Sequence, residues 1–278
     1  MSNIPISIVT PTFQSDTFSR CRRSVLSQKL PVEHVIIDGM SGEPWYSDIL
    51  KEVDSSTVLI SEPDEGIYDA LNKGIGLCRG ELVGVLHSDD VYQTPNVLKN
   101  VVKIVQQTGC DVVYGDLVYV DSHDKPIRYW RSGHFRRASL VFGWMPPHPT
   151  LFIRRNVFAR IGLYNESYRI AGDYEFVLRL FRTTGLRVCY IPTVLTRMSL
   201  GGVSNRSIAQ ILNKTLEDVR AMKAHGISPL LGVPTKNLRK VFQFSPVLRH
   251  DSRKLSHVQH LQVSKSERTW DEYTIKQT

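Results

Sequence analysis

A hydrophobic run, residues 82–86, leads directly into two adjacent carboxylates at His87-Ser88-Asp89-Asp90. Carboxylate oxygens are hard ligands that suit Mg²⁺ or Mn²⁺, and such an ion can bridge to the diphosphate of a substrate. The alternative is an ordinary acidic turn, which the Asp-Asp pair alone would favour. The position of the pair after an apolar run, with other acidic segments at equivalent places, favours a functional site.

Those other acidic segments also follow short apolar runs, at Asp38, at residues 62–65 and at Asp116. In an open α/β sheet, ligands bind at the carboxyl ends of the strands. Carboxylates clustered at one sheet edge are costly unless a positive charge neutralises them, so we expect a divalent cation there. Asp38 alone has two interpretations, a turn residue before Gly39 or an acceptor of hydrogen bonds from a base or ribose.

Asp173 stands in the segment Ala171-Gly172-Asp173-Tyr174-Glu175, where a helical pattern begins. An Asp at this place is commonly a helix N-cap. It can also serve as a general base that takes a proton from an acceptor hydroxyl. The two roles are compatible, although capping lowers the pKa of a carboxylate and makes it a weaker base.

Residues 125–165 carry eight Lys or Arg and no Asp or Glu, with Tyr129, Trp130 and Trp144 among them. One interpretation is a solvated basic face. The other is a cleft that holds a phosphorylated acceptor, and the unbroken sign of the charge just before Asp173 favours it.

The elements that would position these residues alternate along the first 130 residues. We predict strands at residues 6–9, 34–37, 58–60, 82–86 and 112–114. Predicted helices lie between them, at 17–28, 44–53, 67–78 and 95–107. Near-continuous Val, Ile and Leu runs separated by helices predict an α/β fold whose mostly parallel sheet is covered on both faces. Farther along we predict strands at 151–153 and 188–191 and helices at 156–161, 174–183 and 207–224.

Other features exclude several classes of protein. There is no GxGxxG and no GxxxxGK[ST], so a nicotinamide enzyme and a P-loop protein are disfavoured. The four cysteines form no CxxC pair, which indicates a reducing compartment. We see neither a signal peptide nor a run of about 18 apolar residues, so we expect a cytoplasmic protein without a membrane span.

Taken together, the motifs resemble the inverting family 2 glycosyltransferases with the GT-A fold, in the branch that builds bacterial surface polysaccharides. The resemblance covers about residues 4–205, and we take residues 1–205 as the catalytic domain and 206–278 as a helical, basic extension. Gly172 stands where the family often has an acidic residue. The matching segments are Ser7–Phe13, Ile36–Ser41, Glu62–Gly74, His87–Asp90, His148–Arg155 and Gly172–Glu175.

The resemblance implies an enzyme that moves one sugar from a UDP- or GDP-sugar to an acceptor hydroxyl with inversion, using Mg²⁺ or Mn²⁺. The implied acceptor is a saccharide linked to polyprenyl diphosphate, and the processive QxxRW motif is not found. Asp173 would be the catalytic base, and Asp90, helped by Asp89, would bind the metal. Residues implied at the nucleotide sugar are Thr10, Pro11, Thr12, Asp38, Asp64, Lys73, Ser88 and Asp89; those at the acceptor or diphosphate are His148 and Arg154.

Two other functions stay open at this point. A sugar nucleotidyltransferase has a related sheet, but it would normally show a Gly-rich basic loop after the first strand, and Thr12-Phe13-Gln14-Ser15 is not one. A non-enzymatic polyanion binder would use the basic tail, although no nucleic-acid-binding motif is present.

The net charge of +8 is unevenly distributed. Residues 1–205 hold 22 basic and 21 acidic side chains, whereas residues 206–278 hold 13 and 6, a net of +7. Within that C-terminal extension, residues 236–254 alternate cations with apolar side chains. The pattern suits an amphipathic segment on the anionic inner face of a cell membrane, and a plain solvated tail explains it about as well.

Overall fold

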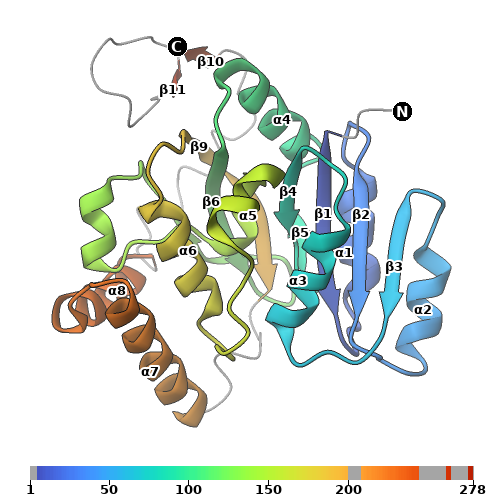
Figure 1. The fold of residues 1–278 in the computed structure, drawn as a ribbon. Helices are drawn as coiled ribbons and strands as arrows, with labels where there is room; N and C mark the ends of the chain where they lie inside the picture. The colour runs from blue at the N-terminus through green and yellow to red at the C-terminus, as the bar shows by residue number, and fades with distance from the viewer. Residues whose placement is uncertain (1–4, 200–207, 244–260, 264–274, 278) are drawn as a thin grey trace.

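A computed structural model describes residues 5–199, 208–243, 261–263 and 275–277 (Figure 1). A nine-stranded sheet has the order β3-β2-β1-β4-β8-β6-β9-β5, and β7 pairs with β6. A separate short hairpin joins β10 (Leu261–Val263) to β11 (Ile275–Gln277). The strands of the main sheet are β1 (Ile6–Thr12), β2 (Glu33–Asp38), β3 (Thr57–Ser61), β4 (Leu82–Val85), β5 (Asp90–Tyr92), β6 (Val112–Val120), β7 (Pro126–Trp130), β8 (Phe152–Arg154) and β9 (Val188–Ser199).

The predicted α/β class is confirmed, and the parallel arrangement holds for the N-terminal half of the sheet. Strand β1 pairs in parallel with both β2 and β4, and β2 pairs in parallel with β3. The second half is mixed, since β8 runs antiparallel to β4 and β6, and β5 runs antiparallel to β9. This reversal decides which ends of the later strands meet the site.

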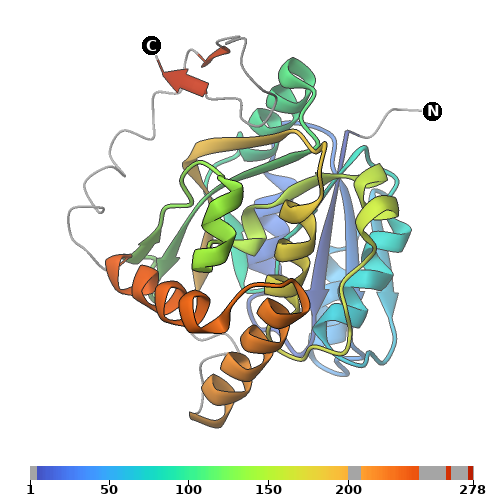
Figure 2. The same ribbon diagram turned by 60° about the vertical axis from the view of Figure 1, so that its left-hand side comes forward.

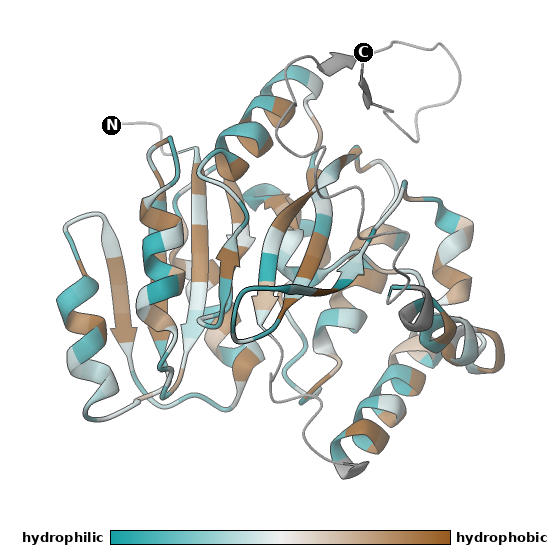
Figure 3. Ribbon diagram, turned by 180° about the vertical axis from the view of Figure 1, so that it is seen from behind, coloured by the Kyte–Doolittle hydropathy of each residue, from teal (hydrophilic) through white to brown (hydrophobic). Residues whose placement is uncertain are grey.

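Helices cover both faces of the sheet, because the residues of its central strands are buried throughout and point alternately to the two faces. Val9 packs in one hydrophobic cluster with residues of α3 and α6, and Ile8 packs in another with residues of α1 and α4. Seen from behind in Figure 3, hydrophobic colour runs along the central strands between the two layers. The helices are α1 (Phe18–Leu26), α2 (Trp45–Glu52), α3 (Ile67–Leu77), α4 (Val97–Thr108), α5 (Arg155–Ile161), α6 (Gly172–Arg182), α7 (Ile208–Ala224) and α8 (Pro229–Phe242), with 3₁₀ turns η1 (Arg137–Phe142) and η2 (His148–Thr150).

The C-terminal extension begins as two packed helices. Helix α7 lies against α6, and α8 lies against α7 and η1 (Figure 2). Gly143 permits the contact with α8, because its φ is +66° and a Cβ there would lie 2.7 Å from Cβ of Lys236. We did not predict α8, whose sequence contains Pro234. The predicted domain boundary at residue 205 and most of the predicted amphipathic segment fall outside the described residues.

None of the helices within the described residues is long and apolar enough to cross a membrane.

Candidate active site

The ends of β1 and β2 lie side by side, with Pro11 opposite Ile37 and Thr12 opposite Asp38. The Thr12 hydroxyl is buried and has no hydrogen-bond partner among the described residues. Thr10 differs, because its side chain is fully buried and hydrogen bonds to Nε2 of His34 at 2.8 Å. The Thr10 side chain therefore belongs to the sheet interior and does not face the open edge where a nucleoside would bind.

Asp38 is also fully buried, and it organises the loop that follows β2. Its carboxylate accepts hydrogen bonds from the Ser61 hydroxyl at 2.7 Å and from the backbone N–H of Ser41 at 3.1 Å, and also from the Ser41 hydroxyl. These contacts correspond to the turn interpretation of Asp38. A ligand hydroxyl would reach this carboxylate by joining or replacing the two serines.

Asp64 and Phe13 meet beside this loop, at Gly39. A Cβ on Gly39 would lie 2.6 Å from Oδ2 of Asp64 and 3.3 Å from the Phe13 ring, so a larger residue there would displace the Asp64 carboxylate. The Phe13 side chain is 59% exposed, although aromatic side chains are usually buried. An exposed ring beside two carboxylates is a suitable platform for a nucleobase, and Phe13 is a candidate that the sequence prediction did not include.

The ammonium of Lys73 is already bound by other groups of the protein. Its Nζ is held by Glu62 at 3.0 Å, by Asp69 at 3.1 Å and by the Pro63 carbonyl at 2.9 Å. Through these contacts Lys73 fixes the loop before α3, and this loop also carries Asp64.

Asp90 is the most unusual carboxylate of the sheet edge. It is fully buried at the start of β5, and neither of its oxygens has a hydrogen-bond partner among the described residues. Burial, followed by the charge of Asp89, raises its pKa well above the ordinary value. An uncompensated buried carboxylate costs stability unless a cation neutralises it. The donor set of Asp90 and the half-buried Asp89 therefore fits a hard divalent cation.

The segment of Ser88 and Asp89 is fixed through its backbone. The Ser88 carbonyl accepts a hydrogen bond from Thr17 at 2.9 Å, and the Asp89 carbonyl accepts one from Ser199 at 3.1 Å. Across the residues described, no group of three or more His, Cys, Asp or Glu side chains is arranged to hold a metal ion. An ion at Asp90 would therefore need further oxygen ligands, such as those of a substrate.

Asp173 lies in the first turn of α6, one residue inside the helix rather than at its N-cap, which is Ala171. The backbone N–H of Asp173 donates to the Tyr68 hydroxyl at 3.1 Å, and its carboxylate accepts the N–H of Tyr174 at 2.7 Å. A Cβ on Gly172 would lie 2.7 Å from the Tyr68 ring. This packing explains why glycine, and no acidic residue, precedes Asp173.

Burial acts to raise the pKa of Asp173, but the positive charges of Lys214 and Lys236 and the N–H of Tyr174 outweigh it. The net pKa is lowered, so Asp173 is ionised at neutral pH and able to accept a proton. Lys214 comes from α7 and Lys236 from α8. Sequence reasoning missed both as site residues, and the only signal for them was the positive charge of the extension.

His87 and His148 pack against each other, and the charge of Asp173 acts on both rings. Their ring centroids are 5.9 Å apart, and the His148 ring hydrogen bonds to the Tyr164 hydroxyl. Burial lowers the pKa of His87, against the opposing charges of both Asp89 and Asp173. Burial lowers the pKa of His148 to about 4. The charges of Asp89 and Asp173 thus both act on His87, and that of Asp173 also acts on His148. Burial keeps both rings neutral.

Arg154 does not lie with these residues. Strand β8 runs antiparallel to β4, so Arg154 sits opposite Leu82, at the beginning of β4 and not at its end near Asp90. Its guanidinium pairs with Glu81 and donates to the Cys110 carbonyl. The predicted role of Arg154 at the diphosphate is therefore contradicted by the direction of the strand.

Asp116 and the basic stretch also differ from the prediction. Asp116 lies within β6 rather than after it, where it accepts hydrogen bonds from Tyr190 at 2.7 Å and Tyr129 at 2.9 Å. The cations of residues 125–165 do not form one patch, since Arg155 bonds to the Gly80 carbonyl and Arg160 to that of Thr184.

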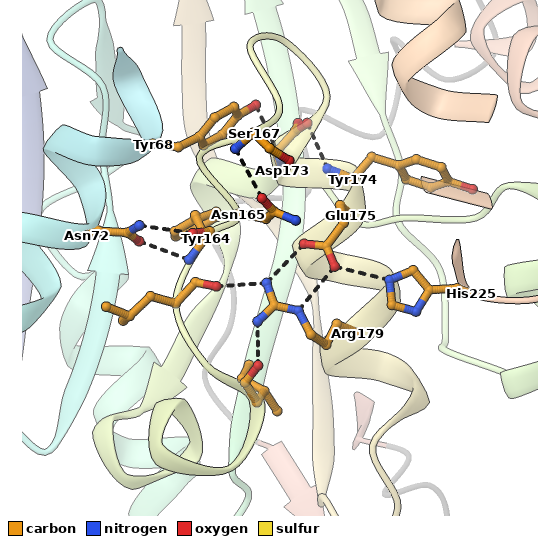
Figure 4. Close-up of polar contacts among 12 residues, drawn as sticks. Tyr68, Asn72, Tyr164, Asn165, Ser167, Asp173, Tyr174, Glu175, Arg179 and His225 are labelled. Carbon is orange, nitrogen blue, oxygen red and sulfur yellow. Dashed lines mark hydrogen bonds and ion pairs between the residues drawn. The ribbon is translucent and has the colours of Figure 1, made fainter. Parts of the chain in front are cut away.

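Helix α6 and the loop that precedes it are anchored by two groups of polar contacts. Figure 4 shows the Glu175 carboxylate between the guanidinium of Arg179 and the ring of His225, at 2.9 and 3.1 Å. On the opposite side, Asn72 of α3 exchanges two hydrogen bonds of 2.9 Å with the backbone of Tyr164. The segment after α7 thus holds α6, and α3 holds the loop that leads into α6, so both contacts help to fix the position of the base.

The fold is that of nucleotide-sugar glycosyltransferases of the GT-A type. Residues 1–349 of S. aureus TarS, solved in complex with UDP-GlcNAc, match with a TM-score of 0.57 and 15% identity, over 80% of this chain and 70% of that one. The mannosyltransferase PcManGT from Pyrobaculum calidifontis, solved with GDP-Man and Mn²⁺, also gives 0.57 and 15%, over 86% and 74% of the two chains.

The family model described as "Glycosyl transferase family 2" matches residues 7–171, and the chain belongs to this family. A PGL/p-HBAD biosynthesis glycosyltransferase of Mycobacterium bovis is 28% identical over 235 residues, which cover 82% of this chain and 86% of that protein. The O-antigen biosynthesis protein RfbC of Myxococcus xanthus is 26% identical, over 79% of this chain but 18% of its own length. The protein is thus a glycosyltransferase, and the nucleotidyltransferase and polyanion-binding alternatives are set aside.

Proposed function

We propose that this glycosyltransferase moves a single sugar from a UDP- or GDP-sugar to an acceptor hydroxyl, with inversion at the anomeric carbon. The observation that carries the proposal is the pairing of two carboxylates with opposite properties. Neither oxygen of the buried Asp90 has a hydrogen-bond partner among the described residues, and the charges of two lysines help to keep Asp173 ionised. Both carboxylates act to raise the pKa of Tyr119, which pairs with the same residue of β9, Met198, as Asp90 does.

The donor would occupy the ends of β1 and β2. Pro11, Thr12 and Asp38 would hold the nucleoside, with Asp64 at the ribose and the exposed Phe13 ring under the base. The structural neighbours solved with UDP-GlcNAc and GDP-Man support a nucleotide-sugar donor. Ser88 and Asp89 would border the diphosphate, because they connect β4 to Asp90.

Asp90, assisted by Asp89, would hold Mg²⁺ or Mn²⁺. When bound, such an ion supplies positive charge that stabilises the leaving diphosphate. The protein's own part is to keep one carboxylate buried and without competing partners, and to fix the loop before it through Thr17 and Ser199.

Asp173 would take the proton of the acceptor hydroxyl as that oxygen attacks the sugar from the face opposite the diphosphate. The lowered pKa keeps Asp173 in the form that can accept the proton. His148 is buried and its pKa is about 4, so it would position the reacting sugar as a neutral group through its contact with Tyr164.

The acceptor in this proposal is a saccharide on polyprenyl diphosphate, used in surface polysaccharide synthesis on the cytoplasmic face of the membrane. Relatives named for PGL/p-HBAD and O-antigen biosynthesis support a surface glycoconjugate. The two C-terminal helices support membrane contact, because six large aliphatic side chains there are at least half exposed. They are Ile211, Leu212 and Leu216 on α7, and Leu230, Leu231 and Leu238 on α8.

The test is a donor and metal screen with two variants. Nucleotide-diphosphate sugars are incubated with membrane-extracted acceptor and Mn²⁺, and the anomeric configuration of the product is read by NMR. We expect Asp173→Asn and Asp90→Ala to lose at least about 10²-fold in turnover, in line with the contribution of a general base. Asp48→Asn, on the exposed helix α2, is the matched control. Wild-type turnover in Asp173→Asn, or a retained configuration, would refute the mechanism.

A further inference from the structure

A cavity of about 220 Å³ lies between β7, the loop after η1 and helix α8. Its aromatic walls come from Tyr129, Trp130 and Trp144, and the Trp144 indole N–H donates to the Ser132 carbonyl at 2.9 Å. Ligand sites for larger molecules run from roughly 300 to 1,000 Å³. This cavity therefore has room for one sugar ring or a similar group, and not for an oligosaccharide.

The charge of the cavity is positive. Arg131 and Arg239 lie exposed among its lining residues, Lys236 lies at its buried side, and no Asp or Glu is among the residues that line it. Arg239 makes no ion pair with any described residue. Guanidinium groups bind phosphate oxygens in pairs of hydrogen bonds, and the apolar face of a pyranose ring packs on indole.

The cavity wall is built and held by buried contacts. Asp116 accepts hydrogen bonds from the Ser132 N–H at 2.8 Å and from Tyr129 at 2.9 Å, so it fixes the backbone that carries Arg131. Gly143 allows α8 to approach closely enough to close the other side. This rigidity pre-organises the cavity, which reduces the entropy lost when a ligand binds.

The cavity adjoins the proposed site of reaction in two ways. Nζ of Lys236 lies 3.4 Å from the ring centroid of Tyr174, the neighbour of Asp173. Along the β6–β7 pair, the Arg128 guanidinium lies over Tyr119 at 4.5 Å and over Trp130 at 5.7 Å. Tyr119 lies two strands from Asp90, because both residues pair with Met198 of β9. Trp130 follows Arg128 by two residues on β7, so it lies about 7 Å, roughly one sugar length, from the guanidinium that covers Tyr119.

We propose that this cavity is an acceptor subsite for a sugar ring that carries a phosphate or diphosphate, with the ring on Trp130 and the anion on Arg131 and Arg239. The inference rests on the proposed function for the direction of transfer. It adds a place and a chemistry for the acceptor that the catalytic residues do not specify. Helix α8 is in this view part of the substrate site.

The first experiment measures binding without turnover. Thermal shift is recorded in EDTA with UDP present, using the 1-phosphates of glucose, galactose, mannose and N-acetylglucosamine against their neutral methyl glycosides. We expect at least one sugar phosphate to bind at least tenfold more tightly than its neutral partner, and Arg131→Ala with Arg239→Ala to abolish the difference. Arg136→Ala, an exposed cation of the same stretch outside the cavity, is the control. Equal affinity for phosphates and glycosides, or no binding of either, would overturn the inference.

A second arm distinguishes the source of the anion. The same sugars attached through diphosphate to farnesol are compared with the free phosphates. Tighter binding of the farnesyl compounds identifies a lipid-linked acceptor, and equal binding identifies recognition of the phosphosugar alone.

The third arm uses turnover. Arg239→Ala and the conservative Trp130→Phe should raise the acceptor KM at least tenfold and about threefold, respectively, and leave the donor KM within twofold. An unchanged acceptor KM, or an equal rise in the donor KM, contradicts the subsite. If no nucleotide sugar supports transfer at all, the proposed function fails while the binding arm still decides the cavity.

Discussion

Glu217 of α7 reaches across to the loop that carries the proposed base. Its carboxylate accepts three backbone hydrogen bonds, from Arg169 and Ile170 at 2.8 Å and from Ala171 at 2.7 Å. These N–H groups precede α6, where a negative charge is also favoured by the helix dipole. We predict that Glu217→Ala releases this loop and misplaces Asp173.

The magnitude follows from the contacts. A hydrogen bond to a charged group contributes about 1.5–3 kcal/mol, and the exposed position of Arg169 reduces its share by solvent screening. The two part-buried bonds, from Ile170 and Ala171, therefore give an expected loss of about 3–6 kcal/mol in the free energy of unfolding. A displacement of about 1 Å in a reacting group can reduce the rate about 10²-fold, so kcat should fall about 10- to 100-fold while the donor KM stays within about threefold.

The assay combines urea unfolding with steady-state kinetics for Glu217→Ala, Glu217→Gln and the control Asn213→Ala on the same helix. Glutamine keeps one acceptor oxygen but turns an N–H group toward the loop, so Glu217→Gln should be intermediate in kcat. A purely structural role would lower stability with kcat preserved in the folded fraction. That result, or a kcat for Glu217→Ala above half of wild type, would refute the reasoning.

Three further predictions follow from single groups. Lys214→Met removes a cation that lowers the pKa of Asp173, so this pKa should rise. The acid limb of the plot of kcat/KM against pH should then move to higher pH. Lys223→Met on the same helix should leave the acid limb in place. Asp90→Asn should stabilise the metal-free protein by about 1–3 kcal/mol, since an unsatisfied buried charge is removed. The same variant should abolish any rise of Tm with Mn²⁺ and UDP. A destabilised variant whose Tm still rises with Mn²⁺ would contradict this prediction. Asp116→Asn should flatten the pH dependence of stability. Burial raises the pKa of Asp116 to about 6, so the folded state binds a proton that the unfolded state has lost, and the stability of the wild type falls by about 3 kcal/mol as pH rises from about 4 to 6. Urea unfolding of both proteins across that range measures the difference.

The parallel half of the fold was predictable because its signals are local. Runs such as Val35–Ile37 have continuous apolar residues, and the helices between them have clear amphipathic faces. Placement of Asp38 and Asp90 at one edge followed from the rule that parallel strands end together. Arg154 was placed at the diphosphate by the resemblance, and nothing local to β8 reveals that this strand runs antiparallel to β4.

Strands β5 and β7 and helix α8 were missed for related reasons. Strand β5 consists of Asp90, Val91 and Tyr92, and forms only because β9 extends to Ser199 and pairs with it. Strand β7 begins at Pro126, which reads as a turn residue. Helix α8 contains Pro234 and is held by long-range contacts with Asp218 and with the loop at Gly143. In each case a distant partner, absent from any local window, decides the structure.

The positive charge of the extension also acquires a more specific explanation than membrane attraction. Lys236 belongs to the segment predicted to lie on a membrane, yet it is buried, bonds to Asp218 at 2.7 Å and contributes to the lowered pKa of Asp173. Lys214 acts on Asp173 in the same direction. Two cations of the extension therefore serve the proposed base, and the exposed leucines beside them offer the apolar surface. The exposed leucines and the lysines that lower the pKa of Asp173 lie on the same two helices, α7 and α8. Removal of the extension should therefore impair catalysis on a water-soluble acceptor as well as on a lipid-linked one.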